Sequence, residues 1–278
     1  MQMAKEKLLL LFRTSRPLFW PVLPLVFAAA LRFSGASWSW QAIMQALLLG
    51  FPYCLLLYGI NDIYDYASDL RNPRKRGQLY GIVLAPVHHP LVKKAAALCA
   101  GMLLLSSFFP KSGSNLLAMG VLLISSYAYS APPLRTKTRP ILDSLSNAVF
   151  YFLAPFALGW SFSRPLLLLP PKIYLVALAM AGYHALSTIG DYTVDRSVGD
   201  RTIAVAIGKR ATAIIAAACS LVPLLFGGIK ASIVRYALIA CVAIPLAVAA
   251  YPSEKLTAFL VKLVYAIFLV SAVVYSFL

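Results

Sequence analysis

Long apolar segments, separated by short polar loops, are the feature that most constrains this chain. A helix needs about 20 mostly apolar residues to cross the hydrocarbon core of a bilayer, and by that rule the sequence predicts about nine crossings. The predicted spans are 17–34, 41–60, 92–109, 115–131, 144–162, 172–190, 210–227, 232–250 and 256–278. The expected fold is therefore all-α: a polytopic membrane protein whose helices surround a central cavity.

Composition supports a membrane protein and argues against a soluble one. The chain is 61% hydrophobic and 12% charged, whereas soluble domains carry about 45–50% apolar and about 25% charged residues. Lys and Arg outnumber Asp and Glu by 25 to nine, but these basic residues occupy short loops between apolar segments. We therefore expect a lipid bilayer and no nucleic acid as partner. No soluble domain or linker interrupts the chain, so residues 1–278 are predicted to form a single membrane domain.

The distribution of basic residues predicts an orientation. With nine spans and the N-terminus inside, 19 of the 25 Lys and Arg residues fall on the inner side. Cytoplasmic loops of membrane proteins carry an excess of Lys and Arg. The sequence therefore predicts an N-in, C-out protein of the plasma membrane.

Acidic residues are concentrated in two short clusters. Six of the nine acids lie within 61–69 or 191–200, at the ends of the second and sixth predicted spans. Acids next to a membrane core are costly and are functional candidates by default. Because the two clusters are four spans apart, both lie on the inner face, and the active site is expected to face the cytoplasm. This spacing also indicates an internal repeat of four-helix units, near 17–131 and 144–250, related by an axis along the membrane normal.

The spacing within each cluster indicates a magnesium site. Asp62, Asp65 and Asp69 are spaced i, i+3, i+7, and Asp191 and Asp195 are spaced i, i+4, so each set falls on one helix face. Such carboxylates repel one another unless a cation or a proton intervenes. Mg²⁺ prefers hard oxygens and shares its shell with phosphates. The predicted metal ligands are Asn61, Asp62, Asp65, Asp69, Asp191 and Asp195. Helix capping, or pairing with nearby Lys and Arg, is the alternative.

Basic residues follow the first cluster and the fourth span. Arg and Lys in inner loops set topology, but beside carboxylates they also suit a diphosphate, whose charge needs both Mg²⁺ and basic side chains. Arg135 and Lys137 stand out because Pro132-Pro133 fixes their approach. The predicted diphosphate-binding residues are Asn61, Arg71, Lys75, Tyr129, Arg135 and Lys137.

Three polar residues within or beside the spans are pocket candidates. His184 precedes Asp191 by seven residues and shares its helix face, and Asp143 and Asn147 are spaced i, i+4 at the start of the fifth span. They either bond between helices and cap a helix, or line the cavity near a reacting carbon. The sequence has no GxxxxGK[ST], HExxH or CxxCH motif, which argues against nucleotide phosphates, zinc and haem.

The two acidic motifs resemble the paired signatures of the UbiA superfamily of intramembrane prenyltransferases. The matching residues are Asn61-Asp62-x-x-Asp65-x-x-x-Asp69, Asp191-x-x-x-Asp195 and the trailing Gly199-Asp200-Arg201-Thr202. The resemblance implies Mg²⁺-dependent transfer of an isoprenyl group from an allylic diphosphate donor to a lipophilic acceptor. It also implies that Asp65, Asp191 and Asp195 are catalytic.

Within that family, the sequence is most similar to the lycopene elongase branch. The similar segments are Tyr58 to Tyr66, Ser68 to Lys75 and Leu142 to Asn147. This branch adds C5 units from dimethylallyl diphosphate to lycopene to build C50 carotenoids, and some members also hydrate the product. The alternatives are prenylation of an aromatic quinone precursor or of a glycerol phosphate lipid, a Mg²⁺-dependent cyclase or diphosphatase, and a transporter of a phosphorylated lipid.

Overall fold

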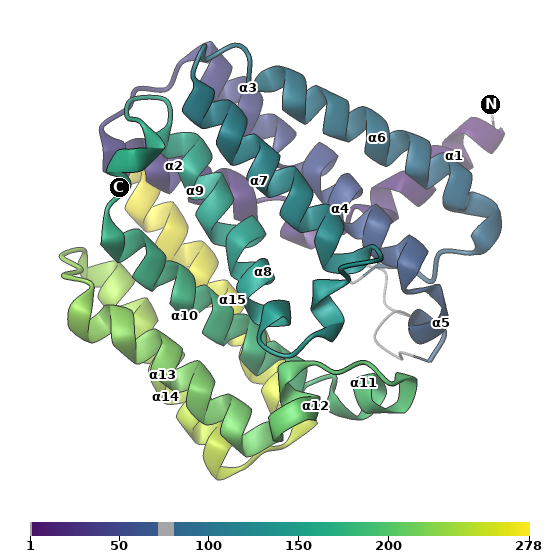
Figure 1. Ribbon diagram of the computed structural model, residues 1–278, viewed down its shortest axis with the longest axis vertical. Helices are drawn as coiled ribbons and strands as arrows, with labels where there is room; N and C mark the ends of the chain where they lie inside the picture. Colours follow the sequence, from purple (N-terminus) through teal and green to yellow (C-terminus); the bar gives the residue numbers. More distant parts are fainter. Residues whose placement is uncertain (1, 72–80) are drawn as a thin grey trace.

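The computed structural model describes residues 2–71 and 81–278, and within them the chain is helical, without strands. Figure 1 shows α6 and α7 on one side of the bundle and α13 and α14 on the other, with α9, α10 and α15 between them. The α-helices are α1 (Gln2–Thr14), α2 (Val22–Ser34), α3 (Trp40–Leu48), α4 (Phe51–Tyr64), α5 (Tyr66–Asp69), α6 (His89–Ser106), α7 (Gly113–Ser130), α8 (Leu142–Ala148), α9 (Ala154–Trp160), α10 (Pro171–Ile189), α11 (Tyr192–Val198), α12 (Ile203–Ile207), α13 (Lys209–Phe226), α14 (Ser232–Ala250) and α15 (Glu254–Phe277). Short connecting turns are η1 (Pro17–Phe19), η3 (Pro86–His88), η4 (Thr136–Thr138) and η6 (Leu166–Leu168), and η5 (Val149–Leu153) is a π-helix.

Each predicted span coincides with helical structure, so the all-α prediction is confirmed for the described residues. Six segments are long and apolar enough to cross a membrane: Pro17–Ser34, Trp40–Tyr64, Pro171–Ile189, Lys209–Phe226, Ser232–Ala250 and Glu254–Phe277. The other three predicted spans correspond to α6, to α7 and to the α8–η5–α9 segment. Nine crossings and the N-in, C-out orientation stay predictions.

Two predicted spans are interrupted. The second divides at Leu49-Gly50 into α3 and α4, and the fifth passes through η5 before α9. Pro52 and Pro155 lie in the first turns of α4 and α9. Because proline lacks a backbone N–H, it removes a helical hydrogen bond and favours a break or a wider turn just before it. The widened turn at η5 carries the aromatic residues 150–152, which line the central cavity.

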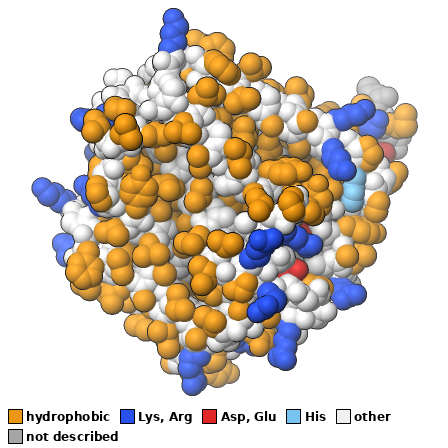
Figure 2. Space-filling view, viewed as in Figure 1, with side chains coloured by type: hydrophobic (Ala, Val, Ile, Leu, Met, Phe, Trp, Pro, Cys, Tyr) orange, Lys and Arg blue, Asp and Glu red, His pale blue; other side chains and the backbone are white. Residues whose placement is uncertain are grey.

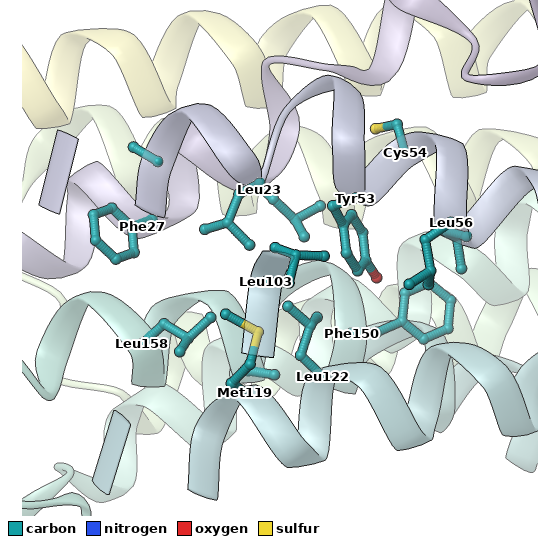
Figure 3. Close-up of a cluster of buried hydrophobic side chains, with 14 of the residues drawn as sticks. Leu23, Phe27, Tyr53, Cys54, Leu56, Leu103, Met119, Leu122, Phe150 and Leu158 are labelled. Atoms are coloured by element: carbon teal, nitrogen blue, oxygen red, sulfur yellow. The ribbon is translucent and has the colours of Figure 1, made fainter. Parts of the chain in front are cut away.

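The largest apolar core joins α2, α4, α6, α7 and α9 (Figure 3). Leu23 of α2 faces Leu103 of α6 and Leu122 of α7, and all three are fully buried. A polar exception is Tyr53, whose hydroxyl lies 2.8 Å from Ser126 Oγ. A buried hydroxyl without a partner would be costly, so this bond allows a tyrosine at the centre of the core.

Small residues bring α10 against α13. A Cβ at Gly182 would lie 2.8 Å from the Ala216 carbonyl oxygen and 2.8 Å from Cys219 Cβ. Membrane helices pack closely where small residues let their backbones approach. This contact fixes α10, which carries residues of both the cavity and the second acidic motif.

Apolar side chains cover much of the surface. Figure 2 shows a face dominated by hydrophobic residues, with Lys and Arg side chains gathered around an acidic one. Exposed large hydrophobic residues occur on each helix of at least 18 residues, including Leu98 on α6, Leu225 on α13 and Phe259 on α15. Such a surface is unfavourable in water and favourable in lipid.

Candidate active site

The two acidic motifs have the same local structure. Asp65 follows α4 with φ −102° and ψ 3°, and Asp191 follows α10 with φ −108° and ψ 6°. A short helix then begins in each case, and its first-turn hydrogen bond joins Asp69 N to Asp65 O (2.8 Å) or Asp195 N to Asp191 O (2.9 Å). The chain therefore turns at both motifs, whereas the sequence predicted one continuous helix face for Asp62, Asp65 and Asp69.

Both motifs lie on one side of the bundle. The short helices α5 and α11 contact each other, and Arg71 Nη1 donates to the carbonyl oxygen of Ser197 at 3.4 Å. The segments that follow Asp65 and Asp191 therefore meet on this side of the bundle. The repeat of four-helix units stays a prediction, although this matched local geometry agrees with it. Lys75 lies outside the described residues.

A loop between α7 and α8 places two cations beside the motifs. Lys137 Nζ forms an ion pair with Asp65 Oδ1. Arg135 Nη2 lies 3.4 Å from Asp65 Oδ1 and 3.9 Å from Asp200 Oδ1, so it reaches toward both motif regions. Arg135 has a left-handed backbone (φ 38°), a conformation that a non-glycine residue adopts only when its surroundings enforce it.

The second motif is crowded with negative charge. Burial raises the pKa of Asp195 to about 7, and the Asp191 carboxylate adds to this rise, while Thr202 and Lys137 oppose it. Burial also raises the pKa of Asp200, against the charges of Lys137 and Arg135. The ammonium of Lys137 therefore acts on Asp65, Asp195 and Asp200 together. A positive charge is stabilised at this point between the motifs.

These residues fit Mg²⁺ by the chemistry of their donors. In residues 2–71 and 81–278, no three His, Cys, Asp or Glu side chains lie close enough together to hold a metal ion. However, Asp65, Asp191 and Asp195 supply hard carboxylate oxygens around the point where Lys137 already provides a positive charge. A divalent cation bound there would meet oxygen donors from both motifs, which is the environment that Mg²⁺ prefers.

Asp62 faces a different partner. It is fully buried, and its Oδ1 lies 2.7 Å from Arg16 Nη2. The same Arg16 nitrogen donates to Asn61 Oδ1 at 3.2 Å, and the guanidinium lies 4.2 Å from the ring centre of Tyr58. The structure thus pairs Asp62 with Arg16, and its assignment as a metal ligand stays a prediction. Sequence reasoning counted Arg16 only as a topology residue, although its position just before the first span and on the same side as both motifs was a usable signal.

A long cavity of about 750 Å³ opens from this region into the bundle. Its polar end includes Asn61, Tyr129, His184 and Asp191, and its far end includes Lys172. One face of α10 lines it from Ile173 to Ser187, a rise of about 21 Å along the helix. The remaining lining is mainly apolar, from α2, α9, α14 and α15. The cavity therefore suits a long hydrocarbon with a charged group at one end.

Of the three pocket candidates, two line the cavity and one lies behind its wall. His184 and Asn147 line the cavity. Asp143 is fully buried behind the wall, where it accepts hydrogen bonds from Ser144 N (2.6 Å) and from Ile203 N at the start of α12 (2.8 Å). Asp143 therefore caps a helix, as one interpretation of the sequence expected, but the helix is α12, far along the chain.

Comparison with known proteins identifies the family. The model of the UbiA prenyltransferase family matches residues 18–274. The chain belongs to this family. The predicted resemblance is thereby confirmed, and the matched range includes both acidic clusters described above.

Individual relatives agree with this assignment. "Lycopene elongase/hydratase" of Corynebacterium glutamicum is 33% identical over 154 residues, which are 55% of this chain and 53% of that protein. "Lycopene elongase/hydratase" of Halobacterium salinarum is 35% identical over 198 residues, which are 67% of each protein. The match thus spans only about half the length of several relatives.

A solved structure shares the fold. The structure of a UbiA homolog from Archaeoglobus fulgidus bound to DMAPP and Mg²⁺ superposes with a TM-score of 0.71. The identity is 20%, and the superposition covers 96% of this chain and 98% of that one. The likeness extends over nearly all the helices, so the site lies within a UbiA fold.

Proposed function

We propose that this protein is a Mg²⁺-dependent prenyltransferase that transfers a C5 group from dimethylallyl diphosphate to lycopene. The observation that carries the proposal is the apolar cavity of about 750 Å³, which ends at Asp191 and Asn61 beside the cations of the loop that follows α7. A diphosphate needs cations and a metal site, and a polyene needs a long apolar channel. Both environments meet at the polar end of this cavity.

The comparisons support the substrates. Relatives named "Lycopene elongase/hydratase" are 33–35% identical to this chain, and the Archaeoglobus homolog was solved with DMAPP and Mg²⁺. The length of the cavity, about 21 Å along α10, agrees with a linear acceptor rather than a compact one. Hydration of the product is part of the same proposal, since water near the polar end can capture a carbocation.

Side chains at the polar end of the cavity bind the donor and stabilise the charge that develops as it reacts. Asp65, Asp69, Asp191 and Asp195, with Asn61, would hold Mg²⁺, which neutralises negative charge on a departing diphosphate when bound. Lys137 and Arg135 bind the diphosphate oxygens and stabilise the same charge. The apolar walls exclude most water around the allylic carbon as it becomes cationic. The acceptor double bond then attacks that carbon from the apolar part of the cavity.

The first experiment uses purified protein in detergent with Mg²⁺, dimethylallyl diphosphate and lycopene, analysed by mass spectrometry. We expect products heavier by one or two C5 units, with or without added water. Release of diphosphate with unchanged lycopene would show that lycopene is not the acceptor, while the assignment of the donor site would stand. In that case, quinone precursors and glycerol phosphate lipids are the next acceptors to test with longer donors.

Two other functional classes predict different results in the same experiment. A cyclase or diphosphatase would consume the donor without a second substrate. A transporter of a phosphorylated lipid would bind diphosphate without cleaving it. The cations and carboxylates at the polar end favour cleavage, because they stabilise charge that develops on a leaving group.

We also propose that the site faces the cytoplasm from the plasma membrane. Both motifs and the loop with Arg135 and Lys137 lie on the side that carries most Lys and Arg, and the positive-inside rule places that side in the cytoplasm. Labelling of single cysteines introduced at exposed Lys111 and Lys255 in intact cells tests this. External labelling at residue 111 and not at 255 is expected.

A further inference from the structure

Four side chains form a continuous hydrogen-bonded chain beside the polar end of the cavity. Tyr129 Oη, at the end of α7, lies 3.0 Å from His184 Nε2 on α10. The other ring nitrogen, His184 Nδ1, lies 3.2 Å from Ser144 Oγ on α8. Ser144 Oγ in turn lies 3.1 Å from Asp143 Oδ1. Tyr129 and His184 line the cavity, whereas Asp143 is fully buried behind it.

The direction of these hydrogen bonds follows from the number of protons available. Ser144 has one hydroxyl proton and donates it to the Asp143 carboxylate, so its oxygen accepts from His184 Nδ1–H. His184 Nε2 then carries a lone pair and accepts the Tyr129 hydroxyl proton. Asp143 also accepts from the backbone amides of Ser144 and Ile203, and such bonds favour the ionised carboxylate.

We propose that this chain is a proton relay that takes up the proton released when the prenylated acceptor is quenched. The inference rests on the proposed function, because attack by an alkene leaves a tertiary cation on the acceptor. A C–H bond next to that cation breaks, its electron pair forms the new C=C bond, and its proton passes to the Tyr129 oxygen. The Tyr129 hydroxyl proton moves at the same time to His184 Nε2. The resulting imidazolium is stabilised by Asp143 through Ser144.

The same relay serves the hydrated product. When a water oxygen bonds to the cation, one of the two water protons follows the same path to Tyr129 and His184. After product leaves, the imidazolium returns its proton to water and the relay is reset. Neither route needs an oxidant, a reductant or a further co-reactant.

The relay lies at the depth where this proton is released. His184 precedes Asp191 by seven residues, which is about 10 Å of helix. It therefore lies deeper in the cavity than the residues that would hold Mg²⁺ and diphosphate. A cation formed by attack on the allylic carbon is expected on that deeper side, within the apolar part. Tyr129 and His184 both line the cavity, and Tyr129 Oη is the atom that takes the proton from substrate. Ser144 and Asp143 lie behind His184 and act through it as positioning residues.

The test compares Tyr129→Phe and His184→Gln with wild type, using full-length protein in lipid nanodiscs with Mg²⁺, dimethylallyl diphosphate and lycopene. Tyr127→Phe is the matched control, since Tyr127 is an exposed residue of the same helix. General acid–base groups contribute about 100-fold or more, so kcat for product should fall about 100-fold in both relay variants. The Kd of His184→Gln for the donor, measured without acceptor, should stay at the wild-type value, because donor binding precedes the proton transfer. The ratio of hydrated to alkene product should also change.

Ser144 provides a rescue experiment. Ser144→Ala breaks the link to Asp143 and should lower kcat, while Ser144→Thr keeps a hydroxyl and should restore it. A purely structural role, tying α7, α8 and α10 together, would instead lower thermal stability without changing the product ratio. Thermal unfolding of every variant separates these cases.

An independent measurement is the ¹⁵N NMR spectrum of histidine-labelled protein. We expect a neutral His184 with its proton on Nδ1, and a shift of Nε2 in Tyr129→Phe. A proton on Nε2 would overturn the relay. So would folded Tyr129→Phe and His184→Gln variants with the kcat of Tyr127→Phe, since the departing diphosphate would then take the proton directly. If wild type makes no product from lycopene, the proposed function fails and the relay role fails with it.

Discussion

Asp65 and Asp191 occupy equivalent positions in two copies of one local structure. Each follows a long helix with nearly the same backbone angles, φ −102° and ψ 3° against φ −108° and ψ 6°. Each is followed by a tyrosine and, four residues later, by a second aspartate. Seven residues earlier the two copies differ, because Tyr58 faces Arg16 whereas His184 faces Tyr129 and Ser144. The ends that carry the acidic motifs are thus alike, and the positions seven residues earlier have different side chains and different partners.

Asp65→Ala and Asp191→Ala should abolish turnover and leave a folded membrane protein. Either change removes a carboxylate from the proposed Mg²⁺ site, and loss of one group that stabilises a developing charge lowers kcat by about 100-fold or more. Diphosphate release is the measurement, with elution on size exclusion as the test of folding. Glu6→Ala, an exposed carboxylate of α1, is the control. Wild-type activity from either aspartate variant would contradict the assignment of the metal site.

Lys137→Met should make the protein depend more strongly on Mg²⁺ for stability. Lys137 supplies the positive charge among Asp65, Asp195 and Asp200, so its loss leaves these carboxylates repelling one another. In EDTA we expect a loss of about 1 kcal/mol, which lowers Tm by about 2–4 °C for a chain of this size. Mg²⁺ should then raise Tm more in the variant than in wild type, because it replaces the missing charge.

Lys255→Met is the control for this experiment, since Lys255 is exposed and lies outside the site. Differential scanning fluorimetry of wild type, Lys137→Met and Lys255→Met, each in EDTA and in Mg²⁺, gives the six Tm values that are compared. Equal Mg²⁺ responses of wild type and Lys137→Met would show that Lys137 does not occupy a cation position.

The sequence predicted those parts of the molecule that depend on local pattern. Helix positions follow from runs of apolar residues, and the placement of Asp65 and Asp191 at helix ends follows from where those runs stop. Lys137 and Arg135 were assigned to the diphosphate because of the Pro-Pro turn before them, and the structure brings both beside Asp65.

Contacts between distant residues were not predictable in this way. Asp62 was assigned to the metal because of its i, i+3 spacing, but its partner Arg16 is 46 residues away and reaches it through a left-handed turn (φ 50°). Similarly, Asp143 caps α12 through Ile203, 60 residues along the chain. Such pairings depend on how helices pack, and the periodicity of one helix carries no information about them.

Arg16→Met should destabilise the protein more than it impairs chemistry. Asp62 is fully buried against Arg16 at 2.7 Å, and breaking one side of a buried ion pair costs about 3 kcal/mol or more. Adding Asp62→Asn should recover part of this loss, because a neutral amide is less costly to bury than a carboxylate. Arg13→Met, on the preceding helix, is the control, and thermal unfolding in detergent is the measurement. A double variant less stable than Arg16→Met would show that the two residues do not act as a pair.

Gly182→Ala should weaken the packing of α10 on α13. Its new methyl group would lie 2.8 Å from the Ala216 carbonyl oxygen and from Cys219 Cβ, so one helix must move, at about 1–3 kcal/mol. Gly120→Ala is a matched control on α7, where no atom lies within 4 Å of the added carbon and the higher helix propensity of alanine favours the variant. Thermal unfolding should therefore show a lower Tm for Gly182→Ala and no lower Tm for Gly120→Ala. Equal Tm values would contradict the close contact between α10 and α13.

Ala179→Phe should separate the binding of donor from that of a long acceptor. Ala179 lines the cavity on α10, 12 residues or about 18 Å of helix away from Asp191. A phenyl ring there fills the apolar part of the cavity and leaves the polar end intact. We expect the variant to lose prenylation of lycopene while a truncated polyene, about half as long, is still prenylated. Ala218→Phe, on the exposed face of α13, controls for the effect of a bulky residue. If Ala179→Phe prenylates lycopene at the wild-type rate, the acceptor does not lie along α10, and the length of this cavity does not select the substrate.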